Sequence, residues 1–349
     1  MRTAPEDYVV VESHRDHTEL VKRRARGEAR PLRDGLLPRL AEASYNIIVM
    51  PFGGDGAHHR DGSQRPLAGS LEIVDMFLNE AEASDGKAAV IRTTKDLPSR
   101  PDDGVVRFLM EIEGTRPMQE DYSVGRWPIE RRLHLVRMFH RLGIRSLHLT
   151  HQGRNELGDG LNELGSGGKL SKFGVALIRE GFRLGMMMSL SHLIPECYYH
   201  AIEVAEGPLV ATHSNAMTLL NHSRNLTDDQ MKALAAIDGV VGIHLWAPIL
   251  HPEKDPLVDV LDYIVYVAEL IGAEHIGFGT LNRDPGYIES MGGGHREVIT
   301  EPGGSEPVSI RRGLELFLEG LADRGFNEDE IAGIVGGNYV RVLQEVLPA

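Results

Sequence analysis

The sequence predicts an α/β protein built as a closed, TIM-like (β/α)8 barrel. Nine short apolar runs rich in β-branched residues alternate with longer segments of helical periodicity along the 349 residues. This alternation is typical of repeated βα units around a parallel sheet. The composition, with 42% hydrophobic and 25% charged residues, gives no sign of a boundary between two domains. We therefore expect residues 1–349 to form a single barrel domain that ends in a C-terminal helix.

The predicted strands follow one another in chain order. A barrel needs eight strands and the sequence offers nine, so one run is expected to be an extra or edge element. We expect that element to be residues 88–92. The nine runs are residues 8–13, 45–51, 88–92, 105–112, 144–150, 185–191, 209–212, 240–246 and 275–279.

Two helix starts between and after the strands carry capping-box spacing. Thr227 and Gln230 precede the apolar-periodic residues 231–237, and Asn327 with Glu330 opens the last helix in the same way. Both sites predict a helix N-terminus.

Charge and cysteine content exclude several classes of function. With 51 acidic and 37 basic side chains the net charge is −14, which disfavours nucleic-acid and anionic-membrane partners. Cys197 is the single cysteine, so neither an intrachain disulfide nor a thiolate cluster can form, and His, Asp and Glu must hold any metal. The apolar run near the N-terminus is too short for a signal peptide or a membrane span, so a cytoplasmic protein is expected.

Metal-ligand side chains follow the predicted strands. The carboxyl ends of barrel strands meet on one face, where active sites form. His14 and Asp16 are two residues apart and can face the same ion. Each residue alone has an ordinary structural explanation, but together they predict a site in which Glu113 bridges two ions, one held by His14 and Asp16 and the other by His192 and His213. Such a pair would acidify a shared water.

Several blocks of the sequence, in order, carry a family likeness: SHRDH, MEIEG, LGIRSLHLTHQGRNELGDG, FGVALIREGFRLGMMMSLSH, ATHSNA, RNLTDDQMKALAAIDGVVGIHLW and IVGGNYVRVLQEV. Over nearly the whole chain they resemble the membrane (renal) dipeptidase family of the amidohydrolase superfamily, zinc-dependent enzymes that cleave dipeptides. The resemblance implies a metal-dependent amidohydrolase-type barrel, a small dipeptide-like substrate and a homodimer.

The same resemblance implies roles at matching positions. His151 would polarise the scissile carbonyl and stabilise the oxyanion, and Arg224 would bind the free α-carboxylate of the substrate. The structural alternatives are a packed loop histidine and a helix-capping surface arginine. The implied cofactor is two Zn²⁺ ions bridged by Glu113, with the ligands His14, Asp16, Glu113, His192 and His213.

One position departs from the family pattern. After the last strand the family has an aspartate that serves as general acid and base, and Leu281 stands there in this chain. General acid–base assistance contributes about 10²- to 10⁴-fold in rate, so its loss would suppress hydrolysis while leaving metal binding intact. Asp284 is the candidate catalytic replacement.

Three functions therefore remain open. The first is a dipeptidase-like hydrolase acting on a dipeptide or an N-acyl amino acid. The second is a diverged enzyme with a lyase, isomerase or tailoring reaction on an amino-acid-like metabolite, and the third is a catalytically silent binding protein.

Overall fold

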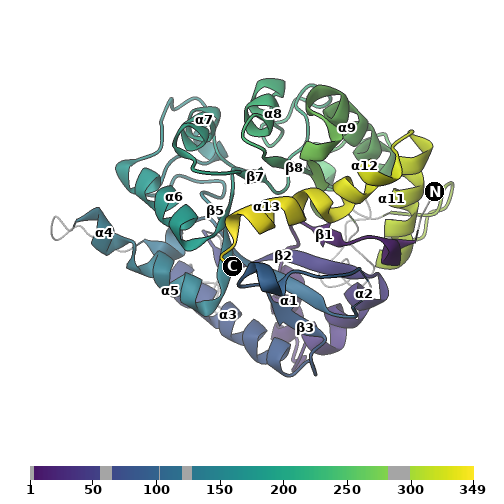
Figure 1. Ribbon diagram of the computed structural model, residues 1–349, viewed down its shortest axis with the longest axis horizontal. Coiled ribbons are helices and arrows are strands. Elements are labelled where there is room, and N and C mark those ends of the chain that lie inside the picture. The colour runs from purple at the N-terminus through teal and green to yellow at the C-terminus, as the bar shows by residue number, and fades with distance from the viewer. Residues whose placement is uncertain (1–3, 56–64, 102, 120–127, 282–298) are drawn as a thin grey trace.

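Parallel strands form one sheet that closes on itself (Figure 1). The computed structural model describes residues 4–55, 65–101, 103–119, 128–281 and 299–349. A pairing between β2 and β4 closes a ring of eight strands, which confirms the predicted (β/α)8 barrel. The described strands are β1 (Val10–Glu12), β2 (Tyr45–Gly54), β3 (Ala88–Val90), β4 (Val106–Glu113), β5 (Ile144–His148), β6 (Met187–Ser189), β7 (Val210–Ala211), β8 (Val240–Ile243) and β9 (Ile276–Phe278).

The strand β3 lies outside the ring, as predicted for residues 88–92. It pairs with the first residues of β4, from Val106 to Phe108. On β4 the partner β5 begins only at Met110, so the amino-terminal part of β4 has room for this extra neighbour. The strand β3 therefore extends the barrel wall and lies outside the closed ring of eight strands.

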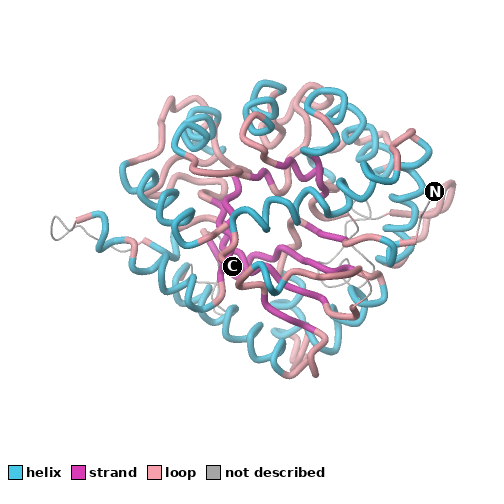
Figure 2. The backbone as a smooth tube through the Cα atoms, viewed as in Figure 1, coloured by secondary structure: helices cyan, strands magenta, loops and turns pink. Residues whose placement is uncertain are grey.

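Helices surround the strands, as the cyan coils around the magenta segments show in Figure 2. Both predicted capping boxes are confirmed, Thr227 before α8 and Asn327 before α12. Among the described residues, none of the helices has the length and apolar character that crossing a membrane requires. The α-helices are α1 (Thr18–Ala25), α2 (Leu37–Glu42), α3 (Pro66–Glu82), α4 (Ile129–Arg132), α5 (His134–Leu142), α6 (Lys172–Leu184), α7 (Pro195–Val204), α8 (Asp228–Ala235), α9 (Pro256–Ile271), α11 (Ile310–Asp323), α12 (Glu328–Ala332) and α13 (Asn338–Val346).

The C-terminal helix α13 closes the amino-terminal end of the barrel. Its buried Tyr339 and Val342 form one apolar cluster with inward-facing strand residues such as Val11 and Leu109. A Cβ on Gly336 would lie 2.1 Å from the carbonyl oxygen of Val9, just before β1, so the chain crosses the strand starts at close range. The opposite end, where the strands finish, remains for the polar site.

Candidate metal centre

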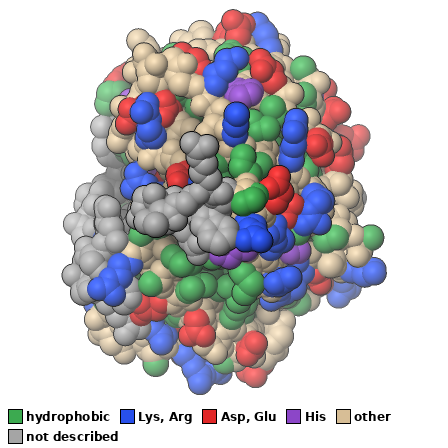
Figure 3. Space-filling view, turned by 90° about the vertical axis from the view of Figure 1, so that its left-hand side faces the viewer, with side chains coloured by type: hydrophobic (Ala, Val, Ile, Leu, Met, Phe, Trp, Pro, Cys, Tyr) green, Lys and Arg blue, Asp and Glu red, His purple; other side chains and the backbone are tan. Residues whose placement is uncertain are grey.

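A pocket of about 250 Å³ lies at the carboxyl ends of the strands. Figure 3 shows histidine side chains reaching the surface beside basic ones on one face of the molecule. The pocket is lined by all seven described residues that the sequence predicts for the site, together with Gln152, His244 and Trp246. The lining residues are His14, Asp16, Glu113, Gln152, His151, His192, His213, Arg224, His244 and Trp246.

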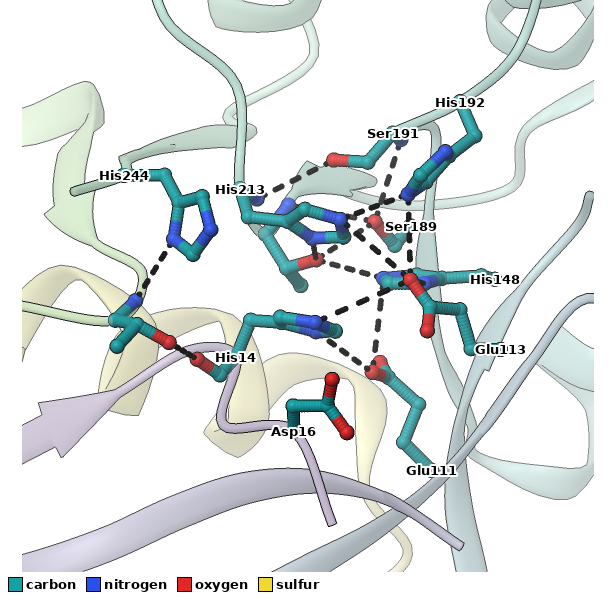
Figure 4. Close-up of polar contacts among 12 residues, drawn as sticks. His14, Asp16, Glu111, Glu113, His148, Ser189, Ser191, His192, His213 and His244 are labelled. Carbon is teal, nitrogen blue, oxygen red and sulfur yellow. Dashed lines mark hydrogen bonds and ion pairs between the residues drawn. The ribbon is translucent and has the colours of Figure 1, made fainter. Parts of the chain in front are cut away.

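Glu113 stands at the centre of this pocket, at the end of β4 (Figure 4). Its Oε1 atom lies 3.2 Å from His192 Nε2, 3.5 Å from His213 Nε2 and 3.9 Å from His14 Nε2. It also lies 3.4 Å from His148 Nδ1. One carboxylate oxygen thus faces four imidazoles, an arrangement of side chains that could hold a metal ion.

Backbone geometry at the strand ends fixes these side chains. Ser13, directly before His14, donates its hydroxyl hydrogen bond to the Thr212 and Phe278 carbonyls at 2.7 and 2.8 Å, which ties β1 to β7 and β9. His192 has a φ of 75°, in the left-handed region that non-glycine residues rarely adopt. Strained backbone of this kind persists where the surrounding structure holds it, and it concentrates at functional sites.

The charge states in the pocket suit metal binding. Burial lowers the pKa of His192 well below 6.5, and the nearby Arg224 guanidinium lowers it further. Burial and the neighbouring His14 lower the pKa of His213 in the same way. Burial alone would raise the pKa of Glu113, but the surrounding histidines outweigh it and hold that pKa well below its usual 4.5. His192 and His213 are therefore neutral beside an ionised Glu113, the protonation states that these ligands need.

Asp16 lies in the same pocket, but it stands apart from the other predicted ligands. Its Oδ1 accepts a hydrogen bond from the Thr18 backbone N–H at 2.8 Å and another from the Thr18 hydroxyl. Within the described part of the chain, the groups whose ligand atoms lie within 4.8 Å of one another contain Glu113 and histidines and do not contain Asp16. Its role as a ligand stays a prediction.

Arg224 and His151 flank the histidines from the loops. Arg224 is only 5% exposed and donates to the His213 carbonyl at 3.1 Å, so it is not the surface arginine of the structural alternative. Burial lowers its pKa to about 10, which leaves the guanidinium charged at neutral pH. The His151 ring lies 4.5 Å from the His192 ring, centroid to centroid, and its backbone N–H donates to Asp55 at 3.3 Å.

Leu281 is buried in the apolar core at 1% exposure. The preceding Thr280 donates its hydroxyl to the His14 carbonyl, so Leu281 follows a residue anchored beside the site. Asp284, the candidate replacement for the missing carboxylate, lies outside the described residues.

Two buried residues of the site, His148 and Glu111, were not predicted from the sequence. The Glu111 Oε1 atom lies 3.7 Å from His14 Nδ1 and 3.6 Å from His148 Nε2. Glu111 and Glu113 are two apart on β4, and His148 ends β5, so alternation along the strands turns all three toward the barrel interior. This alternation along the strands is the sequence signal from which Glu111 and His148 could have been predicted as site residues.

Comparisons with known proteins agree with this geometry. A sequence model of the family described as "Membrane dipeptidase (Peptidase family M19)" matches residues 52–348. Dipeptidase aclJ of Aspergillus oryzae is 34% identical over 247 residues, which are 70% of this chain and 52% of aclJ. Dipeptidase verJ of Clonostachys rogersoniana is 26% identical, over 82% of this chain and 67% of verJ. The chain thus spans about half to two thirds of these curated relatives.

Solved structures show the same fold. A metallo peptidase from Rhodobacter sphaeroides, liganded with a phosphinate mimic of the dipeptide L-Ala-D-Ala, superposes with a TM-score of 0.77 at 21% identity, covering 97% of this chain and all of the other. Dipeptidase AC, a family M19 metallo peptidase, gives a TM-score of 0.76 at 22% identity, covering 99% and 100% of the two chains.

Proposed function

This chain belongs to the membrane dipeptidase family, peptidase family M19, and we propose that it is a zinc-dependent, dipeptidase-like hydrolase acting on a dipeptide or an N-acyl amino acid. The observation that carries the proposal is the convergence of imidazoles on Glu113 in a pocket that also contains a buried, charged Arg224. A metal site and a carboxylate-binding group in one cavity are what the hydrolysis of a small peptide needs.

The donor set fits zinc. Neutral imidazole nitrogens and carboxylate oxygens are its usual non-thiolate ligands, and the single cysteine, Cys197, is held elsewhere by contacts to Gly168 and Asp159. Glu113, His192 and His213 would hold one ion, and His14 with Glu113 and Asp16 the other. Bound zinc would supply Lewis acidity and a water acidic enough to ionise near neutral pH.

The protein side chains would orient the substrate. Arg224 contributes a planar cation that can pair with an α-carboxylate through two parallel hydrogen bonds, and its burial strengthens that pairing. His151 stands on the neighbouring loop and would donate to the scissile carbonyl oxygen as negative charge develops there. A smaller cavity of about 50 Å³ adjoins Arg224 and is lined in part by Leu161, Leu193 and Met217, which suits a small apolar side chain of the substrate.

A second function is favoured by Leu281. A buried leucine cannot carry a proton, so the general acid–base step must use another group, such as Asp284, or the reaction must differ from hydrolysis. A lyase, isomerase or tailoring reaction on an amino-acid-like metabolite would use the same metals and the same Arg224 clamp.

Activity and metal dependence can be tested together. Zinc-loaded protein is assayed by mass spectrometry against a panel of L,L- and L,D-dipeptides and N-acetyl amino acids, beside the same protein treated with chelator. The expected result is cleavage that is lost on chelation and restored by zinc. No turnover of the panel at full metal occupancy would overturn hydrolysis and leave the second function.

A further inference from the structure

We propose that His148 is a ligand of the ion held between His14 and Glu113. The inference rests on the metal site proposed above and adds to it a histidine that the family's ligand set lacks. His148 ends β5, and in the register of the barrel it pairs with Glu113 on β4 and with Ser189 on β6. It is fully buried and lies beside Glu113 and His213 (Figure 4).

The Nδ1 atom of His148 faces the Glu113 carboxylate. This nitrogen has no hydrogen-bond partner among the described residues, although buried ring nitrogens normally have one. It lies 3.4 Å from Glu113 Oε1. Two ligand atoms about 2.0–2.1 Å from a tetrahedral zinc stand about 3.3–3.4 Å apart, so this separation is that of two donors sharing one ion. Ligand atoms of His14, Glu113, His148 and His213 all lie within 4.8 Å of one another.

The other nitrogen of His148 is anchored. Its Nε2 lies 2.7 Å from the Thr212 hydroxyl, which also lies 2.9 Å from His213 Nδ1. The hydroxyl oxygen has two lone pairs and can accept from both rings. With both rings donating there, His148 Nδ1 and His213 Nε2 carry lone pairs toward Glu113. An outer hydrogen bond that fixes the tautomer is the usual support of a metal-bound imidazole.

Glu111 lies beside His14 at ion-pair distance, which is longer than a hydrogen bond. Its Oε2 accepts from the Ser146 hydroxyl at 2.5 Å, while Oε1 faces His14 Nδ1 at 3.7 Å. A carboxylate behind one nitrogen leaves the other, His14 Nε2, to face Glu113 and the ion. Glu111 is thus a positioning residue, and His14, Glu113 and His148 supply the donors.

Asp16 is the donor that His148 would supplement at this ion. The Asp16 side chain is 35% exposed and is occupied by Thr18, whereas the His148 side chain is wholly buried and its Nδ1 has no other described partner. Both Thr18 hydrogen bonds are on Asp16 Oδ1, so Asp16 would approach the ion through Oδ2, and His148 Nδ1 would add a donor beside it.

Metal content of a variant tests the proposal. His148→Phe keeps a ring of similar size and removes both nitrogens, and His275→Phe is the matched control, a part-buried histidine bonded to the Gly239 carbonyl before β9. Zinc per chain is measured by plasma mass spectrometry after dialysis, and affinity by competition with a chromophoric chelator. We expect H148F to lose one ion, or to bind it at least 100-fold more weakly, and H275F to match the wild type. H148F with two ions at wild-type affinity would overturn the proposal.

A second measurement needs no variant and decides the matter if H148F fails to fold. In a crystal of the zinc-loaded wild type, anomalous scattering at the zinc edge locates the ions. We expect His148 Nδ1 within about 2.3 Å of the ion nearest His14. A distance beyond about 3 Å between His148 Nδ1 and the nearest zinc ion would contradict the inference. Neither readout is catalytic, so zinc on His148 without peptidase activity would refute the proposed hydrolysis alone.

Discussion

The Nε2 atoms of His192 and His213 lie 2.9 Å apart, although the two residues follow different strands, β6 and β7. Two protonated rings could not share that gap, and burial keeps the pKa of each well below 6.5. The two neutral ring nitrogens are therefore suited to binding a metal cation and poorly suited to binding protons.

This pairing predicts that the metal-free protein is less stable in mild acid. Because the folded-state pKa values of both rings lie below the usual 6.5, the unfolded chain binds more protons as the pH falls below about 6.5, and stability falls with it. Glu113, whose pKa is also lowered, adds a loss of stability below about pH 4.5. His14 opposes this trend, because Glu113 and Glu111 raise its pKa against the effect of burial.

Melting curves of chelated protein should show the melting temperature falling by several degrees from pH 7.5 to 5.5. His213→Gln should flatten the dependence, and a wild-type melting temperature that rises over this range would contradict the argument.

Restoring a carboxylate at Leu281 should raise peptidase activity. We expect Leu281→Asp to increase kcat/KM for dipeptides by about 10²-fold or more, within the range of general acid–base assistance. Leu281→Asn is the matched control, because asparagine has nearly the same shape as aspartate but cannot carry the proton. Both changes place a polar group at a position where the leucine is only 1% exposed, so both should lower the melting temperature. Equal activity of the two variants would show that more than the proton carrier has changed.

Arg224 should distinguish substrates by their carboxylate. Arg224→Met is expected to lower kcat/KM for a free dipeptide by about 10²-fold, since a buried charge pair is lost, and to change little for the corresponding dipeptide amide. Arg224→Lys should keep the charge and lose the two-pronged geometry, with an intermediate effect. The same loss for acid and amide would mean that Arg224 only supports the His213 loop.

Gly114 should be intolerant of a side chain. It follows Glu113 with a φ of 88°, and a Cβ there would lie 2.3 Å from Asp55 Cγ. Gly165 has nearly the same φ, 89°, with nothing within 4 Å, so Gly165→Ala isolates the backbone cost of about 1–2 kcal/mol. Gly114→Ala adds overpacking of about 1–3 kcal/mol. Urea unfolding measures the difference, and equal losses for the two variants would show that Asp55 moves aside freely.

Much of the fold could be predicted because each barrel strand is an apolar run whose period differs from that of the helices. The extra strand β3 was identified correctly, since eight strands close the ring and residues 88–92 form a short run that pairs with the first residues of β4, before β5 begins. The capping boxes at Thr227 and Asn327 are local signals and were equally readable.

The site was predictable only where its residues follow strands. His14, Glu113, His192 and His213 stand at such ends and meet in one pocket. His148 and Glu111 lie within strands that were treated as apolar runs, although their alternation placed them inside. Arg224 comes from a loop, whose path depends on tertiary contacts such as its bond to the His213 carbonyl, so only family resemblance indicated it.

The hydroxyl of Ser13 bonds to the carbonyls of Thr212, directly after β7, and of Phe278 in β9, and β1 is flanked by β2 and β9. The first strand of the chain therefore takes its final place only after the last one has arrived. Until residues 276–278 are in place, β1 is flanked on one side only, by β2, and Ser13 lacks the Phe278 carbonyl as an acceptor, so the strand that leads to His14 is incompletely held. Metal capture would then be a late event that marks completion of the barrel.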